Sequence, residues 1–321
     1  MGENKMRKII MILVLGSLCF GSLGPGRIGV DTASASPDGG WCNGSGVLTV
    51  LVLGTDNRTR SYTYGLADSI MIFRIDFEAP AVTVMSLPRD LWVKVPGIRD
   101  ELGVDHVKLN MAYLYGTDEM AFNPDVEDGA GLVALALEEN WGLEIDRTAV
   151  MNMKVFADVV RAIGGIEVYN PAPVYSFHQE KPKYPTGGYF FDGKDAQLYA
   201  RWRDPRNMLD RVDRHSILLE AIIESLFQPD TVPQIPELIS AYQDNVEMNL
   251  SLAQISQLLC LASKREHVEV SFTRIPEEDL LARRTKFPPL NANIYNLVEK
   301  EPGRIEAILQ AFQAGNWPPN N

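Results

Sequence analysis

Charged side chains stand at the ends of three apolar segments. These segments, rich in Val, Ile and Leu and bounded by turn residues, are 47–53, 70–75 and 81–87. Such runs predict buried β-strands, and open α/β sheets carry ligand-binding groups at strand ends. Asp56 follows the first segment, Asp68 precedes the second and Arg89 follows the third. Carboxylates and arginines that meet at one sheet edge suit a divalent cation with an anionic oxygen ligand, most simply phosphate.

A second set of cations lies further along the chain. It consists of five arginines: Arg201, Arg203, Arg206, Arg211 and Arg214. A guanidinium suits bidentate contact with phosphate, and Arg201 and Arg203 would project to one face if they lie on a strand. The alternative for the last three is ion pairing with the interspersed aspartates, which are Asp204, Asp210 and Asp213. For Asp56 and Asp68 the alternatives are turn stabilisation and strand capping.

Further elements must position these groups. Apolar spacing predicts helices over 129–139, 155–163, 216–227, 236–241 and 252–264. Short strands are predicted over 149–153, 166–169 and 268–275, with a short helix or strand over 195–200 and a proline-rich surface loop over 170–188. The order strand, helix, Gly164-Gly165 and strand predicts a βαβ unit, and therefore a layered α/β fold.

Composition limits the possible functions. The 321 residues are 45% hydrophobic and 22% charged, which is ordinary for a globular protein with a real core. The net charge of −12 argues against binding to nucleic acid, because that function needs a basic surface. It does not exclude an anionic ligand in a local pocket lined by arginines.

The amino terminus resembles an export signal. Lys5, Arg7 and Lys8 precede an apolar stretch over 9–23, which is shorter than the roughly 20 residues that span a bilayer. With Ala33-Ser34-Ala35, residues 1–35 fit a cleaved signal peptide, and an uncleaved membrane anchor is the alternative. Residues 36–46 are predicted to be a linker. In both cases the rest of the chain would be exported.

The cysteines leave two interpretations open. One disulfide could join Cys42 and Cys260 outside the cell. Alternatively, Cys260 is a small buried residue of an apolar helix, and this is the interpretation we favour. The four histidines are isolated, so no Cys/His spacing suggests zinc.

The motifs occur in an order that resembles the LytR-CpsA-Psr family of bacterial envelope phosphotransferases. The segments that carry the resemblance are LGTDNR (53–58), ADSI (67–70), SLPRD (86–90), KLNMAY (108–113), GGI (164–166), YARWR (199–203) and DRVDR (210–214). The resemblance implies an α-β-α sandwich around a mixed central sheet. The catalytic domain would cover 47–228, and 229–321 would be a carboxy-terminal portion packed on the same domain.

The resemblance also implies an activity. Such proteins act at the outer face of the cytoplasmic membrane, either anchored there or secreted to the envelope. They take a glycopolymer from a polyprenyl pyrophosphate carrier and transfer it to peptidoglycan, with Mg²⁺ or Mn²⁺. The carrier's isoprenoid tail would need an apolar tunnel, which we expect helices 132–137 and 155–163 to line against the sheet. Plain core is the alternative for these helices.

Roles follow from motif position. Asp56, Asp68 and Arg89 would be catalytic, and the two aspartates would hold the metal. The residues expected to bind the pyrophosphate are Arg58, Arg89, Lys108, Arg201, Arg203, Arg211, Arg214 and His215. Two positions depart from the family pattern: Leu66 replaces an arginine, for which Arg60 could substitute, and His215 replaces a glutamine. We expect His215 to donate a hydrogen bond and to titrate near neutrality.

Two other functions use the same residues. A hydrolase of prenyl pyrophosphates would use water as the acceptor. A binding or regulatory protein of the envelope would keep the lipid pocket without turnover. Release of phosphate from a prenyl pyrophosphate separates the enzymes from the binding protein, and label transfer to peptidoglycan separates the two enzymes.

Overall fold

A computed structural model describes residues 40–57, 65–175, 180–202, 204, 210–226, 228, 231 and 246–318. The predicted signal segment, the predicted helix 236–241 and residues 36–39 of the predicted linker lie outside these residues. Within the described ranges, no helix combines the length and the apolar character that crossing a bilayer requires.

The centre of the fold is a six-stranded mixed sheet with the order β10-β3-β2-β1-β6-β9. Its strands are β1 (Val47–Thr55), β2 (Ala67–Asp76), β3 (Ala81–Leu87), β6 (Arg147–Asn152), β9 (Glu247–Met248) and β10 (Glu269–Arg274). Three two-stranded sheets accompany it: β4 (Trp92–Lys94) with β5 (His106–Lys108), β7 (Ile166–Asn170) with β8 (Gly187–Phe191), and β11 (Leu280–Phe287) with β12 (Ala292–Glu299). The predicted strands of the central sheet are confirmed.

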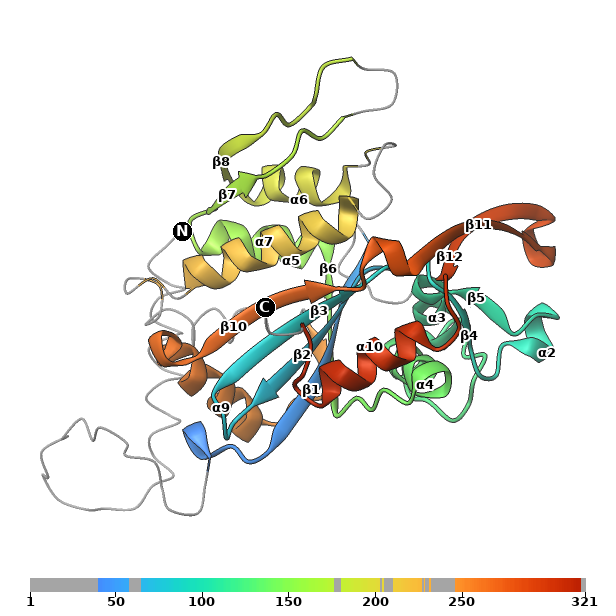
Figure 1. Cartoon of the computed structure of the whole chain (residues 1–321), viewed down its shortest axis with the longest axis horizontal. Helices are drawn as coiled ribbons and strands as arrows, with labels where there is room; N and C mark the ends of the chain where they lie inside the picture. Colours follow the sequence, from blue (N-terminus) through green and yellow to red (C-terminus); the bar gives the residue numbers. More distant parts are fainter. Residues whose placement is uncertain are drawn as a thin grey trace, which may run out of the picture. The chain divides into compact units, whose positions relative to one another are not determined.

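Helices cover both faces of the sheet, as Figure 1 shows. The α-helices are α2 (Arg99–Leu102), α3 (Leu109–Gly116), α4 (Gly129–Trp141), α5 (Met153–Ala162), α6 (Gly193–Arg201), α7 (Asp210–Leu226), α9 (Leu252–Ser263) and α10 (Arg304–Gln313). Short 3₁₀ turns are η2 (Trp41–Asn43), η5 (Arg265–His267), η6 (Glu277–Asp279) and η7 (Pro288–Leu290). One face packs on α3, α4 and α10, and the other faces α5, α7 and α9. This is the expected α-β-α sandwich.

The register of the first three strands brings the charged strand ends to one edge of the sheet, which is called the functional edge below. β1 and β3 each pair antiparallel with β2. The end of β1, the start of β2 and the end of β3 therefore lie at the same edge of the sheet. Alternate residues face opposite ways, so Leu51 and Leu53 enter the core beneath α3 and α4 while Val52 faces the other layer.

The predicted βαβ unit is wrong. β6 lies in the central sheet, but β7 leaves it and pairs antiparallel with β8. Gly164 and Gly165 have φ values of +85° and +105°, which a residue with a side chain rarely adopts. The chain turns sharply there instead of returning beside β6. The region predicted as a loop over 170–188 accordingly includes the end of β7 and the start of β8.

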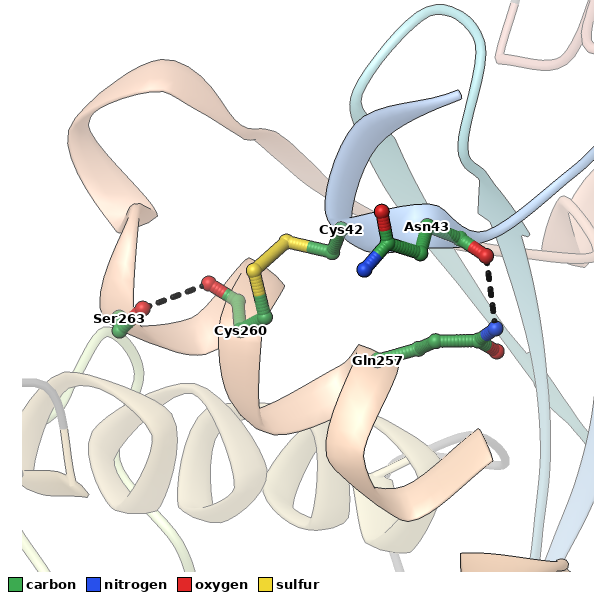
Figure 2. The surroundings of a disulfide bond; sticks show 5 residues. All are labelled: Cys42, Asn43, Gln257, Cys260 and Ser263. Carbon is green, nitrogen blue, oxygen red and sulfur yellow. Dashed lines mark hydrogen bonds between the residues drawn. A yellow bond between two sulfur atoms is a disulfide. The ribbon is translucent and has the colours of Figure 1, made fainter. Parts of the chain in front are cut away.

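The preferred interpretation of Cys260 is also wrong, because Cys42 and Cys260 form a disulfide. Figure 2 shows that it joins α9 to the segment that precedes β1, and the side-chain amide of Gln257 donates to the carbonyl oxygen of Asn43 beside it, at 3.0 Å. The bond links positions 218 residues apart. It fixes α9 over the sheet face that Val50 and Ile75 line.

Candidate functional site

Asp68 lies at the centre of a cluster of ion pairs at the functional edge. Its Oδ1 accepts a hydrogen bond from Nη1 of Arg89, and its Oδ2 accepts one from Nη1 of Arg211 at 2.6 Å. Asn110 adds a third contact from Nδ2 to Oδ1 at 3.4 Å. All three ion-paired side chains are mostly buried, with side-chain exposures of 13–20%. The sequence prediction that an aspartate and arginines would meet here is borne out in geometry.

A second carboxylate links Arg89 to a lysine. Asp90 Oδ1 accepts from Lys108 Nζ at 2.8 Å, and Asp90 Oδ2 lies 3.4 Å from Arg89 Nε. Asp56 lies close enough for its charge to act on Arg89, and its Oδ1 accepts the backbone amide of Leu66 at 2.9 Å. The loop after β1, the start of β2, the turn after β3, the end of β5 and the first turn of α7 therefore bring cations and carboxylates to one place.

The local sequence explains these positions. Thr55 ends β1 and Ala67 opens β2 opposite it, so Asp56 and Asp68 flank the same loop. Pro88 follows the last residue of β3 and turns the chain, which places Arg89 beyond the edge. Arg211 lies in the first turn of α7. Two contacts hold α7 against the sheet. The hydroxyl groups of Ser216 and Ser86 form a hydrogen bond of 2.8 Å, and Asp213 forms an ion pair with Arg274 at 2.9 Å.

The electrostatics of the cluster favour ionised groups. Burial raises the pKa of Asp68, but the charges of Arg89 and Arg211 outweigh burial and hold this pKa below its usual value. Burial lowers the pKa of Arg89, while Asp68 and Asp90 raise it further and prevail. The guanidinium groups thus stay charged, and the carboxylates hold them at the edge. A phosphate group, which is a stronger anion, can replace the carboxylates as their hydrogen-bond partner.

Arg214 and His215 connect α7 with α6. The guanidinium of Arg214 is buried and donates to two backbone carbonyls, that of Tyr199 at 3.0 Å and that of Trp202. His215 Nε2 is 3.1 Å from the carbonyl oxygen of Ala200. Because a carbonyl only accepts, Nε2 carries the proton and donates, as expected from the sequence.

The expectation that His215 titrates near neutrality is wrong. Burial, followed by the charge of Arg211, lowers its pKa to about 4. His215 is 8% exposed and lies against apolar side chains, where a charged ring loses hydration. His215 is therefore a neutral hydrogen-bond donor at physiological pH.

We predict that His215→Gln removes part of the acid sensitivity of folding. The ordinary pKa of 6.5 falls to about 4 in the folded protein, so the unfolded chain binds more protons between these values and stability falls as pH decreases through that window. The loss at pH 4.5 relative to pH 7 is about 2.5 kcal/mol. Glutamine does not titrate and can still donate to Ala200. Urea unfolding at both pH values measures the effect, and equal acid losses in the two proteins would contradict it.

An apolar cavity of about 150 Å³ opens beside the charged cluster. Its walls come from the sheet, from α5 and from α7. The residues that line it include Val52, Gly54, Ser69, Met71, Phe156, Val159, His215, Leu218 and Ile222. Ser69 follows Asp68 in the chain, and His215 lies one turn of α7 after Arg211. A side chain at Gly54 would meet Cβ of Ser69 at 2.9 Å, so glycine keeps this space open.

A second apolar cavity, of about 280 Å³, lies along the same sheet face beneath α9. Val52 lines both cavities, and Ile222 and Ile223 of α7 line one each. The prediction that a helix lines an apolar cavity against the sheet is correct for α5, whose Met153, Phe156 and Val159 line the first cavity. It is wrong for α4, whose Leu132, Val133 and Leu137 pack in the core on the other face of the sheet.

Several predicted site residues stand elsewhere or outside the described ranges. Arg201 is the last residue of α6 and is exposed, so of the two alternatives for this segment, helix or strand, the helix is correct. Arg58, Arg60, Arg203 and Arg206 lie outside the described residues, as does the side chain of Asp210. Leu66 is half-buried beside Asp56. The structure therefore brings together Asp56, Asp68, Arg89, Lys108 and Arg211.

The donor set bears on the expected metal ion. Among the residues that the structure describes, no three His, Cys, Asp or Glu side chains are arranged to hold a metal. Mg²⁺, however, is usually held by one or two carboxylates with substrate phosphates and water. Asp56 and Asp68 both lie near Arg89. They fit an ion that arrives with its phosphate ligands, and they do not form a complete cage by themselves.

Sequence reasoning missed two residues of the cluster. Asn110 is buried at the start of α3 and donates to Asp68, and its Oδ1 is buried without a hydrogen-bond partner in the described structure. Asp90 holds both Arg89 and Lys108. Both residues lie inside the motifs singled out above, within two positions of a predicted cation, and that proximity was the available signal.

The chain is similar in sequence to proteins of one known family. The LytR_cpsA_psr family matches residues 30–307. The polyisoprenyl-teichoic acid–peptidoglycan teichoic acid transferase TagU of Enterococcus faecalis is 27% identical over 214 residues, which are 66% of this chain and 64% of that protein. TagU of Oceanobacillus iheyensis is 28% identical over 221 residues, 66% of this chain and 62% of that protein. The chain thus spans slightly less than two thirds of the length of these relatives.

Solved structures agree in fold. The crystal structure of TagV from B. subtilis superposes with a TM-score of 0.64 at 20% identity and covers 84% of this chain and 98% of that one. Because the family match extends over most of the chain and includes the ion-paired edge, the protein belongs to the LytR_cpsA_psr family.

Proposed function

We propose that the protein is a phosphotransferase that takes a glycopolymer from a polyprenyl pyrophosphate carrier and transfers it to peptidoglycan. The observation that carries this proposal is the convergence of Arg89 and Arg211 on Asp68, directly beside an apolar cavity. A ligand with a diphosphate head and a hydrocarbon tail matches both halves of that arrangement. The relatives TagU are named as teichoic acid transferases to peptidoglycan, and this supports the proposal.

The side chains of the edge would act by positioning and by neutralising charge. The pyrophosphate oxygens would replace Asp68 and Asp90 as partners of Arg89, Arg211 and Lys108. A hydroxyl of peptidoglycan attacks the sugar-linked phosphorus, the P–O–P bond breaks, and prenyl monophosphate leaves. Charge develops on the phosphate oxygens during this exchange, and fixed guanidinium groups stabilise it. Mg²⁺ or Mn²⁺, held by Asp56 and Asp68, would add positive charge at the same oxygens.

The tail of the carrier would occupy the apolar cavities. Each buried methylene contributes about 0.8 kcal/mol of transfer free energy, so an isoprenoid chain supplies much of the binding. Val52 lines both cavities, which allows a long tail to continue from the first into the second beneath α9.

We place the protein at the outer face of the cytoplasmic membrane, anchored by its amino terminus or released to the envelope. The disulfide between Cys42 and Cys260 supports an exported location, because disulfides persist in oxidising compartments and are rare in the cytoplasm. The sequence of residues 1–35, with its basic end and short apolar stretch, supports the same location.

The function is tested with a labelled glycopolymer on prenyl pyrophosphate, peptidoglycan fragments and Mg²⁺. The proposal predicts label on peptidoglycan together with released prenyl phosphate, and loss of both when EDTA removes the metal. Release of prenyl phosphate together with free labelled glycopolymer phosphate, and no label on peptidoglycan, would show a hydrolase instead. Tight binding of the carrier without turnover would show a binding protein.

A further inference from the structure

The hairpin of β11 and β12 carries cations that the proposed transfer does not use. The hairpin contains Arg283, Arg284 and Lys286, and its one acidic residue is Glu299 at the end of β12, in a chain whose net charge is −12. All three side chains are exposed on β11. Within the described structure, none of them has an ion pair or a side-chain hydrogen bond. The hairpin is therefore a local positive surface on an acidic protein.

The hairpin stands directly beside the functional edge. In its second strand, β12, the backbone amide of Leu297 donates a hydrogen bond to the carbonyl oxygen of Asp90 at 2.8 Å. Tyr295 lies near the same aspartate, since burial and then the charge of Asp90 raise the pKa of the tyrosine. Asp90 in turn holds Lys108 and Arg89. A molecule that leaves the edge in this direction meets the hairpin first.

The ribbon is held in place along its length. Phe287, at the far end of β11, packs edge-on against Trp92 of β4 with ring centroids 6.4 Å apart. Arg284 is paired with Tyr295 across the two strands, so both side chains project to the same face. Lys286 follows on that face about 6.6 Å further along the strand. Arg284 and Lys286 therefore follow each other on one face of the hairpin, and Arg283 lies on the opposite face.

We infer that β11 binds the anionic repeating units of the polymer that the pyrophosphate carries, as a second binding surface next to the reaction centre. The inference rests on the proposed function. Charge complementarity supports it, because a polymer with a phosphate or carboxylate on each unit can meet successive cations, and guanidinium groups bind such oxygens well. These cations would hold the polymer while its end reacts between Arg89 and Arg211.

An anionic membrane surface fits the hairpin less well. Helices that lie in a membrane interface carry apolar side chains on one face and cations on the other, and a ribbon bound in the same way would need the same separation. Here Leu281 shares its face with Arg283, while Arg284 and Lys286 occupy the opposite face. Cations on both faces suit a flexible hydrophilic chain better than a flat lipid surface.

The test replaces Arg283, Arg284 and Lys286 together by Gln in the full chain. Fluorescence anisotropy with labelled poly(glycerol phosphate) as the probe should show at least about 10-fold weaker binding, and dextran of similar length should bind neither protein. The matched control replaces Arg161, Lys181 and Lys194 by Gln, three exposed cations away from the hairpin, with the same change in net charge. It should bind the probe as the wild type does.

The arms of the experiment separate the possible results. Equal loss of affinity in both triple variants would show that net charge alone matters. Unchanged affinity in the hairpin variant would show that the cations only protect an edge strand from pairing with other chains. Either result overturns the inference. Loss of binding to phosphatidylglycerol vesicles with unchanged polymer binding would assign the surface to lipid and overturn it as well. The double variant Arg284→Gln/Lys286→Gln, altered on one face only, should lose less affinity than the triple variant.

Turnover distinguishes this inference from the proposed function. With a carrier that bears a single neutral disaccharide, the hairpin variant should transfer as fast as the wild type, while its KM for the polymer-bearing carrier rises about 10-fold. If the wild type transfers neither substrate, the proposed function fails, and the anisotropy result still decides whether the hairpin binds the anionic polymer.

Discussion

Replacement of Asp68 by Asn is expected to lower the rate of transfer at least about 100-fold, a loss typical of removing one preorganised electrostatic group from an active site. The carboxylate of Asp68 accepts one hydrogen bond from Arg89 and one from Arg211. An amide of the same shape has one acceptor oxygen and turns an NH₂ group toward a guanidinium. The two arginines then lose the anchor that holds them side by side. The measurement is kcat/KM for label transfer.

Asp76→Asn is the matched control for this variant. Asp76 ends the same strand β2 at its other end and also pairs with an arginine, Arg74, at 3.3 Å. Its loss should change stability by about 1–2 kcal/mol and leave kcat/KM within about 2-fold. If Asp76→Asn reduces transfer as strongly as Asp68→Asn, the loss reflects the fold of β2, and Asp68 has no special part in the reaction.

Loss of the disulfide is expected to lower the free energy of unfolding by about 4 kcal/mol. The Cys42–Cys260 bond closes a loop of 218 residues, and cross-links over long loops restrict the unfolded chain most. Urea unfolding of the oxidised protein, of the reduced protein and of Cys42→Ser/Cys260→Ser measures the effect. Because the bond fixes α9 over the second cavity, affinity for long prenyl pyrophosphates should fall more than affinity for short ones.

Two controls accompany the disulfide experiment. Reductant should have no effect on Cys42→Ser/Cys260→Ser. Ser263→Ala removes the hydrogen bond from Ser263 Oγ to the carbonyl oxygen of Cys260, at 2.7 Å (Figure 2), but keeps the disulfide. This variant should lose no more than about 1 kcal/mol. A reduced protein as stable as the oxidised one would contradict the assigned role of the bond.

The central strands could be predicted because their local pattern and their environment agree. The runs that became β1, β2 and β3 are continuous, apolar and bounded by turn residues, which is what burial between two helical layers requires. The sequence of a strand does not determine which other strand it pairs with. The 166–170 segment has the pattern of a strand, but nothing in it indicates that it pairs with β8 and not with β6.

Elements rich in polar residues were harder to predict. α7 begins at Asp210, six residues before the predicted start, because its first turns carry the charged groups that bind Asp68 and α6. The β11–β12 hairpin has arginines, lysine and asparagines where alternation would signal a strand. The disulfide joins distant segments, so no local feature of the sequence distinguishes a paired cysteine from a buried one.

The charged cluster was predictable in part. Asp56, Asp68 and Arg89 follow from the strand ends, since antiparallel neighbours bring these ends to one edge. Arg211 belongs to the cluster of five arginines that the sequence singles out, but its place beside Asp68 could not be predicted; Lys108 depended on the family resemblance. The low pKa of His215 could not be predicted, since it depends on burial against residues of the sheet, α5 and α6.

A crystal structure with a long-chain prenyl pyrophosphate tests the central claim most directly. The account predicts that the diphosphate lies within hydrogen-bond distance of Arg89 and Arg211, in place of the Asp68 contacts, with the tail along the face of the sheet that Val52 lines. A diphosphate bound away from these two arginines, or a tail lying on the outer surface with both cavities empty, would contradict it.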